Sequence, residues 1–312
     1  MPLLADYAVT PDVFDVDSYS NEDACHQSLE LIRETMLTEG LVRDLRAGEW
    51  RRLFEDNNRS WYRRGKELIK KLVTQKRLIE FDPALPNQPA DDQDWCAEAL
   101  GTHQAFPFSG GVIVTEAVKA AYPHDPLVAR IDRLGSAPWW ASRSPSVRPC
   151  RTTEDYKKHL DLVLRHSNSL LFIDPYLDPT KRQYRGFHEL LVHAGNRTPS
   201  PLIEIHRVWY EGSGPGRRDV RESLAPNFRD GLENHLRTAG LQVKVFVWDD
   251  FHDRYLISNL IGISMPNGFD TTTKPNDRTT WNRLGRNDRD DVQREFDEAS
   301  RQHNLHQQFT IP

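Results

Sequence analysis

The sequence predicts an α/β protein, with a mixed sheet flanked by helices in its C-terminal half and a mainly helical N-terminal domain before it. Between residues 169 and 247, short apolar runs of strand length alternate with segments of helical period. Before residue 135, helical spacing dominates and only two short runs have strand composition. The 312 residues, 38% of them hydrophobic, are enough for two domains with a sizeable core.

The domain boundaries follow from composition. Residues 136–150 contain three prolines and several serines, a composition typical of a linker. We therefore expect a basic, mainly helical domain over residues 1–135 and an α/β domain over residues 151–312.

The N-terminal domain is expected to contain a basic amphipathic helix followed by a strand over residues 77–81, and a second strand over residues 112–114. Between residues 43 and 77 the chain has twelve Lys and Arg against five Asp and Glu, a local excess of +7. Because the net charge of the whole chain is −5, the rest of the chain carries −12.

A helix and strand with interleaved cations are compatible with a winged-helix-like nucleic-acid-binding domain. In that interpretation the nucleic acid would contact Arg63, Arg64, Lys70 and Lys71. The alternative is that these cations form the solvated face of an ordinary amphipathic helix, and the sequence leaves both interpretations open.

The C-terminal domain begins with an amphipathic segment around residues 156–164. It leads into an apolar strand over residues 169–177 that contains Asp174-Pro175-Tyr176, and a helix over residues 187–192 follows.

A second strand, over residues 202–208, contains His206, and a helix over residues 228–236 comes next. Gly240 is suited to end that helix, because glycine readily adopts the left-handed conformation of a helix C-terminus. Residues 241–247 then alternate as a strand should.

This last strand is followed by the pattern H-x-R-x4-N, formed by His252, Arg254 and Asn259. Its spacing resembles the H-x-K-x4-D signature of the phospholipase D superfamily. In that signature the His attacks phosphorus, the Lys neutralises phosphate oxygens and the Asp supports the site by hydrogen bonding. Arg254 keeps the positive charge and adds a planar donor fork, whereas Asn259 keeps hydrogen bonding without the charge. The variant therefore favours phosphate binding over catalysis.

From about residue 156 to 296 the chain resembles the degenerate phospholipase D-like C-terminal domain of the MIT-domain-containing proteins of membrane trafficking, which carries this variant. The resemblance implies a phospholipase D-like mixed sheet, a homodimer and binding of acidic phospholipid headgroups. The N-terminal half has no recognisable MIT-like module, so the resemblance does not extend to the trafficking role. The residues expected to contact the substrate are Asp174, Tyr176, His206, Asp253 and Asp270.

Catalytic members of the superfamily use two histidine motifs, whereas this chain offers one. Hydrolysis would need a homodimer that brings two copies of His252 together, or another histidine such as His206. A lone histidine among apolar residues is more often a buried structural residue, and that interpretation of His206 stays open.

Several classes of protein are disfavoured. The sequence has no apolar run of about 18 residues and no signal peptide, so we expect a cytoplasmic protein. Cys25, Cys96 and Cys150 are scattered, which argues against disulfides and structural zinc. Residues 212–216 are rich in glycine but lack the ending of a P-loop. We expect no metal and no cofactor.

Three functional hypotheses remain. The favoured one is recognition of a phosphate-bearing ligand, either nucleic acid or an acidic headgroup, by a degenerate phospholipase D-like domain. The alternative is a metal-independent phosphodiesterase or nuclease that uses His252, Arg254 and Asn259 across a homodimer. The third is a component of a multiprotein system, such as a prokaryotic antiviral defence, whose N-terminal domain recognises nucleic acid or another subunit.

Overall fold

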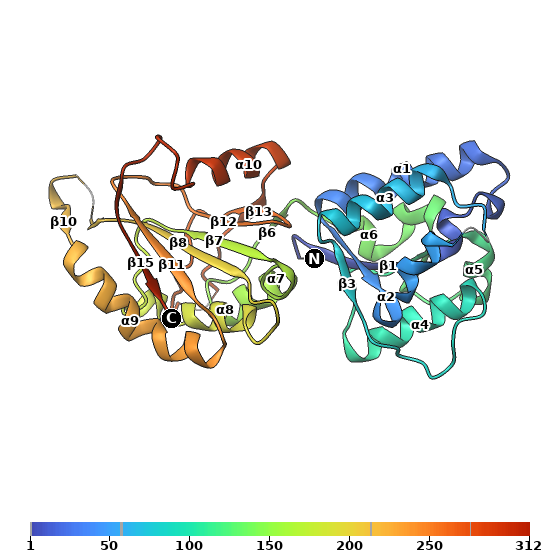
Figure 1. Cartoon of the computed structure of the whole chain (residues 1–312), viewed down its shortest axis with the longest axis horizontal. Helices are drawn as coiled ribbons and strands as arrows, with labels where there is room; N and C mark the ends of the chain where they lie inside the picture. Colours follow the sequence, from blue (N-terminus) through green and yellow to red (C-terminus); the bar gives the residue numbers. More distant parts are fainter. Residues whose placement is uncertain (1, 57–58, 213, 275) are drawn as a thin grey trace. The chain divides into compact units, whose positions relative to one another are not determined.

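The computed structural model describes residues 2–56, 59–212, 214–274 and 276–312. The chain forms two compact units, Met1–Ser144 and Pro145–Pro312 (Figure 1). Both contain a sheet with helices packed against it, so the predicted α/β class is confirmed.

Unit 1 is built on a five-stranded sheet of order β3-β2-β1-β4-β5 in which every neighbouring pair is parallel. The strands are β1 (Ala5–Val9), β2 (Gly40–Asp44), β3 (Leu78–Glu80), β4 (Val112–Val114) and β5 (Val128–Arg130). All residues of β1, β2 and β4 are buried. This pattern is typical of parallel strands, because helices cover both faces of such sheets.

The helices of unit 1 are α1 (Glu22–Thr38), α2 (Leu45–Arg52), α3 (Arg63–Thr74), α4 (Asp92–Ala105), α5 (Glu116–Ala121) and α6 (Pro138–Ala141). In Figure 1, α1 and α3 lie together on one side of the sheet and α4 lies on the other. The apolar side of α3, which includes Leu68, Ile69 and Leu72, is buried against the core.

Two predictions for this half of the chain were wrong. Unit 1 is rich in helix, as expected, but it is not winged-helix-like, because its core is a five-stranded parallel sheet. Residues 136–150 are not a linker either. They contain α6 with buried Trp140, and β6 (Ser146–Val147), which pairs with β14 in the sheet of unit 2. Proline serves here as the first residue of a helix, a position that needs no N–H group.

Unit 2 has an eight-stranded mixed sheet of order β15-β11-β8-β7-β12-β13-β14-β6. Its central strands β7, β8 and β11 are parallel, and the remaining pairings are antiparallel. The strands are β7 (Ser169–Ile173), β8 (Leu202–Val208), β11 (Val243–Trp248), β12 (Tyr255–Ser258), β13 (Gly262–Ser264), β14 (Trp281–Arg283) and β15 (Leu305–Ile311). A short hairpin of β9 (Tyr210–Glu211) and β10 (Arg218–Asp219) lies apart from this sheet.

The helices of unit 2 are α7 (Thr153–His166), α8 (Phe187–Ala194), α9 (Arg221–Thr238) and α10 (Arg286–Glu295). Figure 1 shows α10 on the opposite face of the sheet from α8 and α9. Gly240, at φ +64°, ends α9, and the N–H groups of Gly240 and Leu241 donate to the carbonyls of Arg237 and Leu236. These two bonds form a Schellman motif, as expected of a glycine at this position.

The parallel strands place their carboxyl ends along one edge of the sheet. Asp174 follows β7, Trp209 follows β8 and Asp249 follows β11. Because β12 runs antiparallel to β7 and pairs Tyr255 with Ile173, Arg254 arrives at the same edge beside Asp174.

Among the described residues, no helix combines the length and the apolar character needed to cross a membrane.

Candidate functional site

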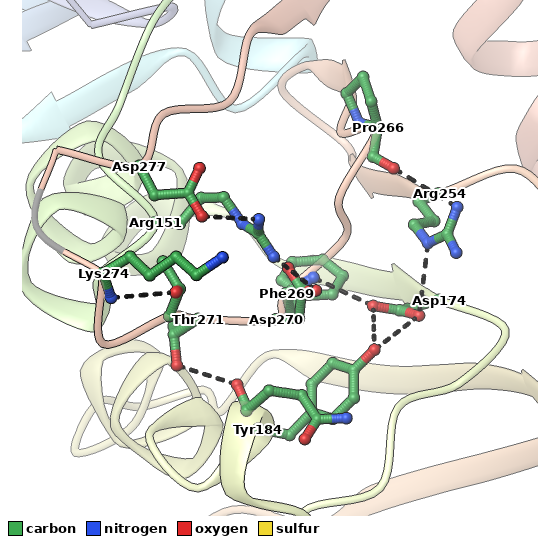
Figure 2. A network of polar contacts seen from close by, with 12 residues as sticks. Arg151, Asp174, Tyr184, Arg254, Pro266, Phe269, Asp270, Thr271, Lys274 and Asp277 are labelled. Carbon is green, nitrogen blue, oxygen red and sulfur yellow. Dashed lines mark hydrogen bonds and ion pairs between the residues drawn. The ribbon is translucent and has the colours of Figure 1, made fainter.

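The centre of the candidate site is Asp174, a carboxylate with 0% of its surface exposed. Its oxygens accept hydrogen bonds from the backbone N–H groups of Tyr176 (3.1 Å) and Phe269 (3.0 Å) and from the Tyr184 hydroxyl (3.2 Å). The guanidinium Nε of Arg254 lies 3.8 Å from the same carboxylate (Figure 2). One buried side chain therefore ties the turn after β7 and Tyr184 to Arg254 and Phe269, which lie far along the sequence.

Burial raises the pKa of the Asp174 carboxyl above its usual range. The N–H groups of Phe269 and Tyr176 and the charge of Arg254 act in the opposite direction and favour the carboxylate. The ionised form of Asp174 thus depends on this set of donors.

Arg254 is the cation of the site that lies beside Asp174. Its Nη1 donates to the carbonyls of His252 (3.2 Å) and Pro266 (3.4 Å), and its guanidinium carbon lies 5.7 Å from the centre of the Tyr176 ring. The side chain is 26% exposed and borders a cavity of about 590 Å³. The cavity is also lined by Tyr176, Lys181, Gln183, Tyr184, Glu211, Gly212, Pro266, Asn267 and Asp270.

Asp270 lies on another wall of this cavity and is held by Arg151. Arg151 binds Asp270 at 2.8 Å and Asp277 at 3.0 Å, and the Tyr156 hydroxyl donates to the Asp270 carbonyl at 3.0 Å. Burial raises the pKa of the Asp270 carboxyl, whereas the hydrogen bond and charge of Arg151 lower it. The negative charge of Asp270 is thus partly balanced by Arg151, which Figure 2 shows between Asp277 and Asp270.

His252 lies at the same edge of the sheet but does not line the cavity. Its side chain is 72% exposed, and its Nε2 is 3.9 Å from Asp250 Oδ1. Asp253 was expected to contact the substrate, but its side chain is exposed and it does not line the cavity. The carboxylate found beside His252 is that of Asp250.

The structure corrects the role predicted for Asn259. Arg254 precedes β12 and Asn259 follows it, so they lie at opposite ends of the strand, about 16 Å apart at the usual rise of a strand. Asn259 Oδ1 accepts the backbone N–H of Asn168 at 2.7 Å. Asn259 therefore fixes the start of β7 and does not contact the cavity.

His206 is likewise not a site residue. It has 0% exposure, stacks on Phe246 at 4.9 Å and accepts the indole N–H of Trp248 at Nδ1. Burial lowers its pKa and so favours the neutral ring. It is the buried structural histidine that the sequence left as an alternative.

Some residues of the site carried no signal in the sequence. Tyr184 belongs to a three-residue 3-10 helix, Arg182–Tyr184, which is too short to show periodicity. Arg151 meets Asp270 across 119 positions of sequence. Gly268 has φ +59°, and a Cβ there would overlap Asp174 Oδ2. A glycine in the turn before Phe269 is the one trace of this geometry in the sequence.

The four cations proposed to bind nucleic acid lie on α3. Arg63, Arg64, Lys70 and Lys71 are all exposed, while Arg63 is within 3.5 Å of Glu67. Three other cations of the basic segment, namely Arg43, Arg46 and Arg77, are buried. The surface excess of positive charge is therefore smaller than the sequence count suggests.

Unit 1 also has polar groups at the switch point of its sheet. This is the pair of adjacent strands from which the chain continues in opposite directions, and ligands of parallel sheets commonly bind at the carboxyl ends of these two strands. These strands are β1 and β4. The Thr115 hydroxyl, just after β4, donates to the buried carboxylate of Asp12, and burial raises the Asp12 pKa. Within the part of the chain that the structure describes, no three His, Cys, Asp or Glu side chains are arranged to hold a metal ion.

Substitution of Asn259 tests its structural role. We expect Asn259→Ala to lower the free energy of unfolding by about 1–2 kcal/mol, because the Asn168 N–H loses its acceptor. Asn259→Asp keeps an acceptor oxygen and should be closer to wild type. Denaturant unfolding measures both. Loss of phosphate binding in Asn259→Ala at unchanged stability would contradict this role.

Gly268→Ala should destabilise unit 2 more than Gly240→Ala. Both glycines have positive φ, but nothing lies within 4 Å of a Cβ at Gly240, whereas a Cβ at Gly268 meets Asp174. We expect a cost of about 1 kcal/mol at Gly240 from backbone strain and at least about 2 kcal/mol more at Gly268. Equal costs by denaturant unfolding would show that the contact with Asp174 is unimportant.

Comparisons with known proteins do not assign a family. No protein-family model and no curated protein matches the chain. Among solved structures it is similar to TrmBL2, an archaeal chromatin protein described as showing a novel mode of DNA binding. The TM-score is 0.31 with 12% sequence identity, over 77% of this chain and 81% of that chain. A TM-score at this level carries no argument about fold or function.

Proposed function

We propose that unit 2 is a degenerate phospholipase D-like domain that binds a phosphate-bearing ligand in the Arg254 cavity without cleaving it. The observation that carries the proposal is the position of Arg254, whose guanidinium borders the cavity and is held by the buried Asp174. A guanidinium fixed in this way presents a planar set of donors that matches the oxygens of a phosphate.

The position of His252 supports binding rather than hydrolysis. A nucleophile must reach the phosphorus of a ligand bound to Arg254, yet His252 is outside the lining of the cavity and largely exposed. His206, the other candidate histidine, is fully buried. A hydrolytic site would therefore need His252 from a second copy of the chain.

The expected ligand is defined by its phosphate group, which is the part that Arg254 would contact. A nucleic-acid backbone and an acidic phospholipid headgroup present the same group to Arg254, and the tyrosines at the cavity can contact either a base or a headgroup. Glu211 and Asp270 also line the cavity, and they disfavour ligands that carry several negative charges close together.

Arg254→Gln should weaken binding of a phosphate-bearing probe by about 1.5–3 kcal/mol, the usual value of hydrogen bonds to a charged group. Arg254→Lys should lie between Gln and wild type, because it keeps the charge and loses the fork. His252→Ala should change the dissociation constant by less than about threefold. The probes are a labelled oligonucleotide and vesicles containing phosphatidylserine, measured by fluorescence anisotropy and by sedimentation.

The same proteins, incubated with labelled DNA, RNA and a model phosphodiester in EDTA, separate binding from hydrolysis. Cleavage by wild type that His252→Ala abolishes would overturn the proposal and establish the homodimeric phosphodiesterase. Retained affinity in Arg254→Gln would show that the ligand does not use the cavity.

Contact between α3 and nucleic acid is a second candidate function, favoured by the exposure of four cations on one helix. Charge reversal at Arg63, Arg64, Lys70 and Lys71 should flatten the salt dependence of DNA binding by about 0.9 in log–log slope for each duplex phosphate that the variant no longer neutralises. The matched control reverses four exposed helix cations of unit 2, Arg229, Arg237, Arg286 and Arg294. Equal slopes in the two variants would exclude a specific role for α3.

A further inference from the structure

Unit 2 has a second cavity, of about 680 Å³, formed by α7, α8, α9 and the segment after α8. None of the described residues that line it also lines the Arg254 cavity. Arg165 and His166 lie at the end of α7, just before β7 begins, and Arg197 precedes β8. These residues are therefore at the amino ends of the parallel strands, the opposite edge of the sheet from Arg254.

We propose that this cavity, the histidine groove, binds a small phosphate-bearing anion, and that its histidines take up protons when the anion binds. The inference is independent of the function proposed for Arg254. It rests on the fixed charges that line the groove and on the stacking of two of its histidines.

The fixed charges give the histidine groove a small positive excess. Lys157, Arg165 and Arg197 contribute three cations. Two carboxylates oppose them, Glu189 at 3.4 Å from Lys157 and Asp161 at 3.7 Å from Arg165. One of the three cations is therefore not balanced by a carboxylate, so this excess charge can attract an anion.

Arg197 is suited to hold the anion. Its Nε donates to the Ala194 carbonyl at 3.1 Å and its Nη2 donates to the Ser167 carbonyl, so backbone groups orient the guanidinium without neutralising it. Burial lowers the pKa of Arg197, which reflects the cost of an incompletely compensated charge. A bound anion would supply that compensation.

Four histidines line the groove, at positions 166, 188, 193 and 235. His188 and His235 stack with ring centres 3.9 Å apart and an angle of 21° between planes. His188 Nδ1 is 2.7 Å from the Arg185 carbonyl and donates to it, which leaves Nε2 as the other polar atom of the ring. His193 Nε2 is 2.6 Å from Asp161.

The stacked pair couples protonation to anion binding. Two imidazolium rings at this distance repel each other, so the unliganded groove resists the second proton. Burial, and then the proximity of His188, lower the pKa of His235 in agreement with this. The lining cations Lys157, Arg165 and Arg197 and the other histidines oppose protonation of the pair, whereas Glu189, and Asp161 beside His193, favour it. An anion adds negative charge, so anion and protons bind cooperatively.

The test uses the full chain carrying Arg254→Gln, so that the first cavity does not contribute. Isothermal titration with sulfate at pH 6.0 and pH 8.0 gives the pH dependence, because sulfate does not itself titrate in this range. We expect the dissociation constant to be about tenfold lower at pH 6.0. Buffers of different ionisation enthalpy should show net proton uptake, and pyrophosphate at pH 7.0 should compete with sulfate.

The variants locate the site. Arg197→Gln should raise the dissociation constant at least about tenfold, since a charged hydrogen-bond donor is lost. His188→Gln with His235→Gln should remove most of the pH dependence, and these partly exposed positions keep the test valid if Arg197→Gln does not fold. Arg237→Gln, on the exposed side of α9, is the control and should bind as the parent does.

Absence of sulfate binding at pH 6.0, or equal affinity at both pH values, would overturn the proposal. So would unchanged binding in both the Arg197 and the double histidine variants. Failure of pyrophosphate to compete would exclude a phosphate-bearing ligand.

Discussion

The geometry of unit 2 at its carboxyl edge depends on the buried carboxylate of Asp174. Burying an ionised carboxylate costs several kcal/mol, by order of magnitude, unless hydrogen bonds and an opposite charge compensate it. Here the hydrogen-bond donors come from the turn after β7, from Tyr184 and from the loop at Phe269, and the opposite charge comes from Arg254. The contacts of these segments with Asp174 hold them together at this edge of the sheet. Position 268 is a glycine because a Cβ there would overlap the same carboxylate.

The ion pair between Asp174 and Arg254 limits how an anion can bind in the Arg254 cavity. Arg254 is already paired with a carboxylate, so a ligand must share the guanidinium with Asp174 and cannot simply replace it. The histidine groove differs in this respect, because Arg197 is oriented by backbone carbonyls. The two cavities thus present differently balanced cations at opposite edges of one sheet.

The sequence predicted unit 2 well, because its strands are bounded runs that alternate with amphipathic helices. The prediction for β8 matches residue for residue, and the expected strand over 241–247 overlaps β11. In unit 1 the sequence predicted β3 and β4, at 77–81 and 112–114, but it did not reveal β1, β2 and β5, for a physical reason. Its parallel strands are only three to five residues long, and β2 carries a buried arginine and a buried aspartate, so it lacks the continuous apolar run expected of a buried parallel strand. Arg43 is paired with Asp6 at 2.6 Å inside the core, so a cation that suggested nucleic acid in the sequence is structural.

Sequence spacing predicted that His252, Arg254, Asp174, Tyr176 and Asp270 lie at one edge of the sheet. It could not predict which of these side chains are buried and which line the cavity. The four residues between Arg254 and Asn259 are the whole of β12, which is why the motif spans the sheet. The face on which His206 lies follows from its partners in β11 and at Phe296, just after α10, which no local pattern in β8 reveals.

The placement of β6 decides how the two halves of the chain can be separated. Ser146 and Val147 pair with β14 as the outermost strand of the sheet of unit 2, although they lie within a segment whose composition suggests a linker. A fragment that begins at residue 151 would leave the polar groups of β14 without their strand partner and create an open edge, a common route to self-association. A fragment that begins at Pro145 keeps that strand, so the useful boundary for expressing unit 2 alone lies inside the segment 136–150 rather than after it.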